Sequence, residues 1–130
     1  MSTFALKELK DYSGRLKIFK LLIDDVSAFD EFCEEIKKEG NLTSELRTIM
    51  ARITEIADLR SLPQEKFKDI TPPKELNKEY EIKTKHLRVY LFHDKKQGRV
   101  IVSGGKKTSQ KPDIKKFRNI KKEYFKQQEK

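Results

Sequence analysis

The spacing of apolar residues switches between two periods along this chain, and those switches constrain the fold more than any other feature. Apolar residues over 29–56 recur every three or four positions, which is the period of a helix with one buried face. Over 80–83 and 87–92 the period is two, which is typical of a strand, and 99–103 is a short apolar run. Helices followed by neighbouring strands predict an α+β protein.

The N-terminal half predicts one strand followed by two helices. Leu16 and Ile18 alternate with lysines and an apolar run follows, which indicates a strand over 15–23. Ser27 is a suitable N-cap for the first helix, and Gly40 is a suitable C-cap for it. A second helix restarts three or four residues after Gly40. So short a link predicts an antiparallel helical hairpin.

The C-terminal half predicts three strands and one helix. Alternation indicates strands over 80–83 and 87–92, and a turn with Gly98 at its tip leads to a strand over 99–103. A basic helix with an apolar stripe starts near Pro112. We therefore expect a small, mostly antiparallel sheet with the helical hairpin on one face, and a C-terminal helix. The other face of the sheet is expected to be open to solvent or covered by a partner.

Length and composition exclude several classes of protein. The 130 residues suffice for one domain, which we expect over 15–126 after an N-terminal extension at 1–14 that forms a loose arm or a helical turn. The single cysteine excludes an internal disulfide framework, and no zinc-binding motif occurs. Neither a membrane span nor a signal-peptide core is present, so we expect a cytoplasmic protein without a metal or a cofactor.

Positive charge is concentrated in the C-terminal part of the chain. Residues 1–73 carry 12 Lys and Arg against 14 Asp and Glu, whereas residues 74–130 carry 18 against 7. This asymmetry favours an anionic partner, and nucleic acid, a membrane surface and an acidic protein all fit it. The alternative is that the lysines only keep the protein soluble.

Several of these cations fall on the predicted strands. Arg88 is the only charge within an apolar run, and it points to the face opposite Leu87 and Val89. Two glycines and two lysines follow the last strand at 104–107. Each feature alone is more typical of a solvated surface, but with Lys83 they place cations on three neighbouring strands. Converging cations suit the binding and cleavage of a phosphodiester, for which RNA supplies its own 2′-hydroxyl nucleophile.

The other residues with reactive side chains have simpler interpretations. His86 and His93 are the only histidines, and we interpret both as surface residues. Cys33 shares the apolar face of the first helix, and we interpret it as a core residue.

The segment from Tyr80 to Phe125 resembles the C-terminal half of the RelE/HigB-type toxins of the RelE/ParE superfamily, especially the phage-derived HigB-like branch. The matching features are an Arg-Val pair in a strand (Arg88-Val89) and a hairpin that leads to an apolar strand (100–102). A Gly-Lys-Lys-Thr segment then leads to a proline (Gly105 to Pro112), and a basic helix follows. The order of elements over residues 15–126 is also similar.

The resemblance implies a RelE-like fold and a toxin of a toxin–antitoxin system. Such a toxin is an mRNA interferase, a metal-independent endoribonuclease that cuts mRNA on the ribosome. Its partners are mRNA on the ribosome and a cognate antitoxin, and it forms a homodimer or a toxin–antitoxin complex. The implied catalytic residues are Lys83, Arg88, Lys106, Lys107 and Tyr124. The residues expected to bind RNA are Lys85, Lys111, Lys115, Arg118 and Lys122.

The resemblance also implies roles for individual residues. Arg88 and a lysine hold the scissile phosphate, and Lys83 acts as a base or stabilises charge. Tyr124 stacks on a base or donates a proton, although its place in the apolar stripe fits a core role equally well.

Three alternatives to a nuclease stay open. The chain fits a catalytically degenerate homologue that binds RNA or an antitoxin, and it fits a ParE-like gyrase inhibitor on the same scaffold. It also fits a basic α+β interaction domain unrelated to toxins. Substitution of Arg88 separates chemistry from binding, because only an enzyme loses toxicity while it keeps its fold.

Overall fold

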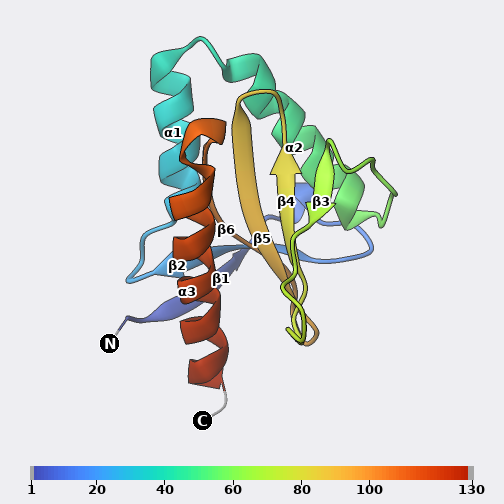
Figure 1. Ribbon diagram of the computed structural model, residues 1–130, viewed down its shortest axis with the longest axis vertical. Coiled ribbons are helices and arrows are strands. Elements are labelled where there is room, and N and C mark those ends of the chain that lie inside the picture. Colours follow the sequence, from blue (N-terminus) through green and yellow to red (C-terminus); the bar gives the residue numbers. More distant parts are fainter. Residues whose placement is uncertain (1, 129–130) are drawn as a thin grey trace.

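The two N-terminal helices begin and end where their capping residues predict. In the computed structural model, which describes residues 2–128, α1 spans Ala28–Glu39 and α2 spans Thr43–Ala57. The Ser27 hydroxyl accepts a hydrogen bond from the backbone N–H of Asp30 at 3.0 Å. Gly40 ends α1 with φ at 81°, a left-handed conformation that glycine adopts without strain. The helices run in opposite directions, so the predicted hairpin is confirmed (Figure 1).

The strands form one six-stranded sheet in the order β1-β2-β6-β5-β4-β3. Every neighbouring pair is antiparallel except β2 and β6, which are parallel. The expected α+β fold with a mostly antiparallel sheet is therefore present. The strands are β1 (Phe4–Glu8), β2 (Ile18–Ile23), β3 (Phe67–Asp69), β4 (Glu79–Lys83), β5 (Leu87–Asp94) and β6 (Gly98–Lys106).

The N-terminal segment adds a strand that the sequence prediction lacks. Residues 4–8 pair with β2 along their whole length, so the prediction of a loose arm or a helical turn is wrong for them. Phe4 and Leu6 alternate with exposed residues and pack on the aromatic side of the sheet, as in an ordinary edge strand. Only Lys10–Tyr12 form a short 3-10 helix.

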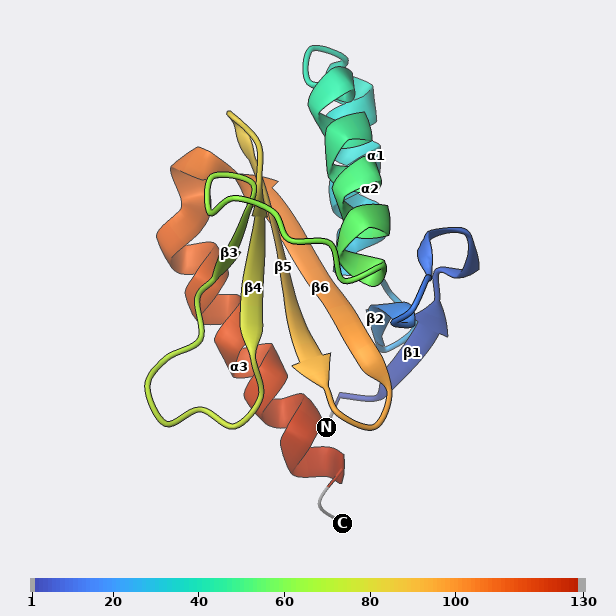
Figure 2. The ribbon, with the colours of Figure 1, turned by 90° about the vertical axis from the view of Figure 1, so that its right-hand side faces the viewer.

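The sheet is covered by helices on both faces. The helices α1 and α2 pack on one face against Leu87, Val89 and Leu91 of β5. The long helix α3 (Gln110–Gln128) packs on the other face (Figure 2). There Phe117 and Tyr124 contact Tyr90 and Phe92. The prediction that this face is left open to solvent or to a partner is therefore wrong, because the chain's own C-terminal helix covers it.

The interface between α3 and the sheet contains charged residues as well as apolar ones. The helix α3 is strongly basic, yet its buried residues include Lys121 as well as Phe117 and Tyr124. Under it, the sheet carries the buried carboxylates Glu79 and Glu81. None of the helices within residues 2–128 is long and apolar enough to cross a membrane.

Candidate nucleic-acid interface

Five of the predicted cationic residues lie at one end of the sheet, where the β4–β5 turn, the end of β6 and the start of α3 meet (Figure 2, top). Lys83 and Arg88 are direct cross-strand partners. The backbone N–H of Lys107, which starts a 3-10 helix, donates to the carbonyl of His86 in the turn at 2.8 Å. We call this set the basic end: Lys83, Lys85, Arg88, Lys106 and Lys107.

The pairing of Lys83 with Arg88 places two like charges opposite each other on the α3 face of the sheet. Cross-strand partners have Cβ atoms about 5 Å apart, and like charges there destabilise the sheet by a few tenths to about 1 kcal/mol. A bound anion between them would reverse the sign of this interaction. The pair is therefore the strongest local indication of an anion site.

Arg88 itself is almost fully buried, with 5% of its surface exposed. Its Nη1 donates to the carbonyls of Thr84 at 2.5 Å and Leu87 at 2.8 Å, so the guanidinium holds the β4–β5 turn. Its Nε is buried without a hydrogen-bond partner. The sequence-based prediction places Arg88 on the correct face, but in this conformation its contacts are to the turn.

The strand β6 extends to Lys106, beyond its predicted end, and Lys106 and Lys107 have different surroundings. Lys106 pairs with Leu87, which belongs to the α1–α2 side of the core, and its ammonium lies 2.6 Å from the carboxylate of Glu39 at the end of α1. Lys107 is exposed beyond the strand. The cations therefore share one end of the sheet, but Lys106 does not share a face with Lys83 and Arg88.

The glycines before these lysines are needed for close packing on both faces of β6. A Cβ atom on Gly104 would lie 2.5 Å from the ring of Phe32 in α1. A Cβ atom on Gly105 would lie 2.2 Å from the carboxylate of Asp113 in α3. A side chain at position 104 would displace the ring of Phe32, and one at position 105 would displace the carboxylate of Asp113.

Tyr124 lies far from the basic end. Its hydroxyl donates to the carboxylate of Asp94 at 2.7 Å, and both residues are buried. Asp94 is six residues along β5 from Arg88, which is about 20 Å at the rise of a strand. Burial, and then the hydrogen bond to Asp94, raise the pKa of Tyr124 above its ordinary value. The structure therefore does not bring Tyr124 into one site with Arg88, and its observed contacts are those of a core residue.

The predicted RNA-binding residues of α3 follow one stripe of the helix. Lys111, Lys115, Arg118 and Lys122 are spaced four, three and four positions apart, which keeps them on one side. The three lysines are exposed. Arg118 instead contacts Glu79 through Nε at 2.9 Å and the carbonyl of Ile70 at 2.7 Å. Lys85, in the β4–β5 turn, is also exposed.

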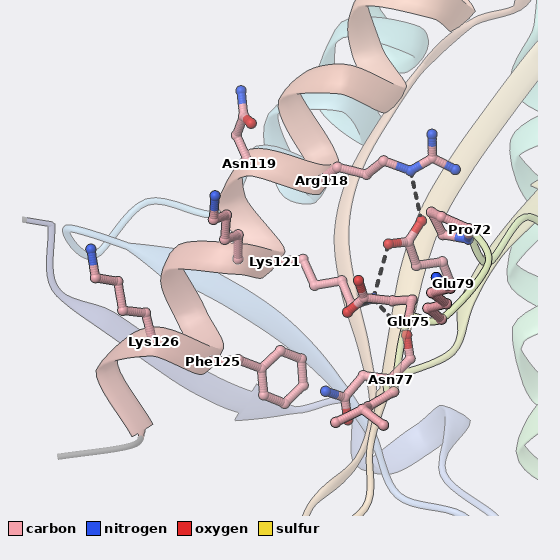
Figure 3. Close-up of a pocket in the computed structure, with 12 residues that line it drawn as sticks. Pro72, Glu75, Asn77, Glu79, Arg118, Asn119, Lys121, Phe125 and Lys126 are labelled. Atoms are coloured by element: carbon pink, nitrogen blue, oxygen red, sulfur yellow. Dashed lines mark hydrogen bonds and ion pairs between the residues drawn. The ribbon is translucent and has the colours of Figure 1, made fainter.

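A cleft with a volume of about 710 Å³ lies between α3 and the loop before β4 (Figure 3). Lys121 reaches into it and contacts Glu75 at 3.2 Å and Glu79 at 2.9 Å, and Arg118 contacts Glu79 from the other side. Lys126 points away from this cluster. Lys121 and Arg118 are thus already paired with carboxylates. The cleft therefore has less unpaired positive charge to bind a polyanion than the basic end has.

The sequence analysis missed a carboxylate–histidine contact at the basic end. Glu45, in the first turn of α2, lies 2.6 Å from Nδ1 of His86. Partial burial acts to raise the pKa of Glu45, but hydrogen bonds from Thr84 and His86 outweigh it, so the pKa lies below its ordinary value. The two residues are 41 positions apart, and no motif connects them.

Comparison with protein-family models, with curated proteins and with solved structures finds no match for this chain. Among residues 2–128, no group of three or more His, Cys, Asp or Glu side chains is arranged to hold a metal ion. Its fold and candidate site define an α+β protein with a cationic end on its central sheet.

Proposed function

We propose that this chain is a RelE/HigB-type toxin that cleaves mRNA on the ribosome. The order of elements supports the proposal, because a strand, a helical hairpin, three strands and a helix are what the resemblance implies, and after β1 the chain has these elements with the short strand β3 added before β4. The location of the cations supports it further. Lys83, Lys85 and Lys107 come from β4, the β4–β5 turn and the segment after β6, yet they gather at one end of the sheet.

The observation that carries the proposal is the cross-strand pair of Lys83 and Arg88. Like charges at directly opposite positions repel each other, although Arg88 also stabilises the β4–β5 turn. An RNA phosphate that binds over them converts a repulsion into an attraction. Lys85 and Lys107, both exposed, add charge beside the pair.

The chemistry needs few groups from the protein. The 2′-hydroxyl of one nucleotide attacks the adjacent phosphate, and negative charge develops on the phosphate oxygens. Lysine ammonium groups stabilise that charge as point charges, and we assign this role to Lys83 and Lys107. Arg88 acts as a positioning residue, because its guanidinium fixes the turn that carries Lys85.

A second candidate is a homologue that binds RNA or an antitoxin without cleavage. Two observations favour it. Arg88 is buried with Nη1 committed to the turn, and Tyr124 is held by Asp94 about 20 Å away. Two of the residues that the resemblance assigns to catalysis are thus committed to structural contacts.

Expression in a bacterium separates these candidates. The test compares wild type, Lys83→Ala/Lys107→Ala and the matched control Lys95→Ala/Lys96→Ala, which removes two exposed lysines at the opposite end of β5. Growth and mRNA cleavage are measured together. A nuclease predicts arrest with codon-phased cuts in wild type and in the control, and loss of both effects in the Lys83/Lys107 variant.

The other outcomes point elsewhere. Arrest without mRNA cuts would indicate another target such as gyrase. Healthy growth with folded wild-type protein would contradict the nuclease and favour the binding homologue. In that case, RNA affinity should fall steeply with salt and should be weaker for the Lys83/Lys107 variant than for the control. Equal RNA affinity of the two variants would show that the basic end is not the RNA-binding site, whichever candidate function is correct.

A further inference from the structure

His86 is held in one orientation beside the basic end. Its Nδ1 lies 2.6 Å from Oε2 of Glu45, and its backbone N–H donates to Oε1 of the same carboxylate at 2.8 Å. The carbonyl of His86 accepts a hydrogen bond from the backbone N–H of Lys107 at 2.8 Å. Backbone and ring are therefore fixed together, although the side chain of His86 is 52% exposed.

Thr84 connects this pair to the predicted phosphate site. Its hydroxyl donates to Oε1 of Glu45 at 2.5 Å, and its carbonyl accepts from Nη1 of Arg88 at 2.5 Å. The hydroxyl also accepts from the backbone N–H of Leu87 at 3.1 Å. Glu45 of α2 and Arg88 of β5 are thus both hydrogen-bonded to Thr84 of the β4–β5 turn, one from each face of the sheet, and the turn fixes the place of His86 between them.

The contact with Glu45 determines which ring nitrogen is free. Because a carboxylate only accepts hydrogen bonds, Nδ1 must carry the proton in the neutral ring. Nε2 then has an unshared electron pair. Carboxylate orientation of an imidazole with a free Nε2 is the arrangement of general-base catalysis.

We infer that His86 is the general base of the proposed RNA cleavage and that Glu45 is the residue that positions it. This inference rests on the proposed function, and it assigns to His86 the proton transfer that the resemblance assigned to Lys83. Nε2 of His86 takes the proton from the 2′-hydroxyl as the 2′-oxygen forms its bond to phosphorus. The bond from phosphorus to the 5′-oxygen breaks, and its electron pair stays on that oxygen, which takes a proton from water.

The products are a 2′,3′-cyclic phosphate and a free 5′-hydroxyl. The imidazolium returns its proton to solvent, so the ring is regenerated and no metal or oxidant is consumed. Lys83 and Lys107 stabilise the charge on phosphate during this step.

The test measures cleavage of a defined mRNA on purified ribosomes by full-length protein. General-base catalysis contributes about 10²–10⁴-fold to a rate, and His86→Ala should lose that factor while its affinity for mRNA-programmed ribosomes stays within about twofold. Free imidazole should restore part of the lost rate in proportion to its concentration. A purely structural role of His86 would give no such rescue.

Two further variants keep the test decisive. His86→Asn keeps a donor for Glu45 without a base, so it should have the wild-type melting temperature and the same loss of rate. Glu45→Gln should lower the rate less than His86→Ala does, with unchanged affinity for ribosomes. His93→Asn is the matched control at the far end of β5, and it should cut at the wild-type rate.

The results that would contradict the base assignment differ from those that would contradict the proposed function. If wild type and both His86 variants cut equally fast, the assignment of the base is wrong and the nuclease stands. If His86→Ala is slow but imidazole restores nothing while His86→Asn cuts normally, His86 is only structural. If wild type binds ribosomes and leaves mRNA intact, the proposed function fails and the base assignment falls with it.

Discussion

The ammonium of Lys121 in α3 lies 2.9 Å from the carboxylate of Glu79 in β4, and both side chains are only 3% exposed. The carbonyl of Asn77 accepts a further hydrogen bond from Lys121 at 2.5 Å, and Arg118 donates to the second oxygen of Glu79. This buried pair connects the basic helix to the sheet. The position of α3 is thus set by paired charges as well as by its apolar stripe.

We expect Lys121→Met to lower the free energy of unfolding by about 3–5 kcal/mol, because it leaves a buried carboxylate with one cation fewer. Urea unfolding measures this change. Lys121→Met/Glu79→Gln should recover part of the loss, since no unpaired charge is then buried. The adjacent, exposed Lys122→Met is the control and should change stability by less than about 0.5 kcal/mol. Equal effects of Lys121→Met and Lys122→Met would contradict the role of the pair.

Tyr124→Phe tests whether this residue acts in the core or in catalysis. The change removes the hydrogen bond to the buried carboxylate of Asp94, which should cost about 1.5–3 kcal/mol of stability. Toxicity and mRNA cleavage should stay at the wild-type level once the protein is folded at the assay temperature. Thermal unfolding measures the stability of the variant, and the cleavage assay measures its activity. Loss of cleavage without loss of stability would instead support the catalytic role of Tyr124 that the resemblance implies.

Local features of the fold can be predicted from the sequence because they depend on neighbouring residues. Ser27 and Gly40 cap α1 as predicted, since capping needs only a side-chain oxygen or a left-handed turn. The period of two places Arg88 opposite Leu87, as observed. The burial of Arg88 could not be predicted, because it depends on the turn and on a helix more than twenty positions later in the chain.

The candidate site could be predicted only in part for the same reason. The cations were found because charge density is visible in the sequence. The direction of Lys106 was missed because its partner, Glu39, is 67 positions away. The contact between Glu45 and His86 was missed as well, because it joins a helix start to a strand turn. Tertiary contacts of this kind leave no local pattern.

The depressed pKa of Glu45 predicts a dependence of stability on acid pH. A carboxyl group whose pKa is lower in the folded than in the unfolded protein stabilises the fold when it is ionised. This contribution is present above its ordinary value of 4.5, and it is lost as the pH falls through the folded pKa. The stability difference between wild type and Glu45→Gln should therefore shrink below pH 4.5.

Urea unfolding at a series of pH values between neutral and acid measures this difference. Glu65→Gln is the control, because Glu65 is exposed in the loop before β3. Its difference from wild type should stay flat over the same range. A difference for Glu45→Gln that stays constant on acidification would show that the contacts with Thr84 and His86 do not favour the ionised carboxylate.

Cys33 should be nearly inert in the native protein. Burial, and then the negative charge of Asp30, raise the pKa of its thiol to about 11, so very little thiolate is present at pH 8. Because an unfolded cysteine has a pKa near 8.5, alkylation by iodoacetamide at pH 8 should be roughly 100-fold slower in buffer than in urea. Cys33→Ala/Ser61→Cys, which moves the thiol to an exposed loop, should react at nearly the same rate in both. Rapid labelling of native Cys33 would mean that the groove between α1 and α2 opens readily to solvent.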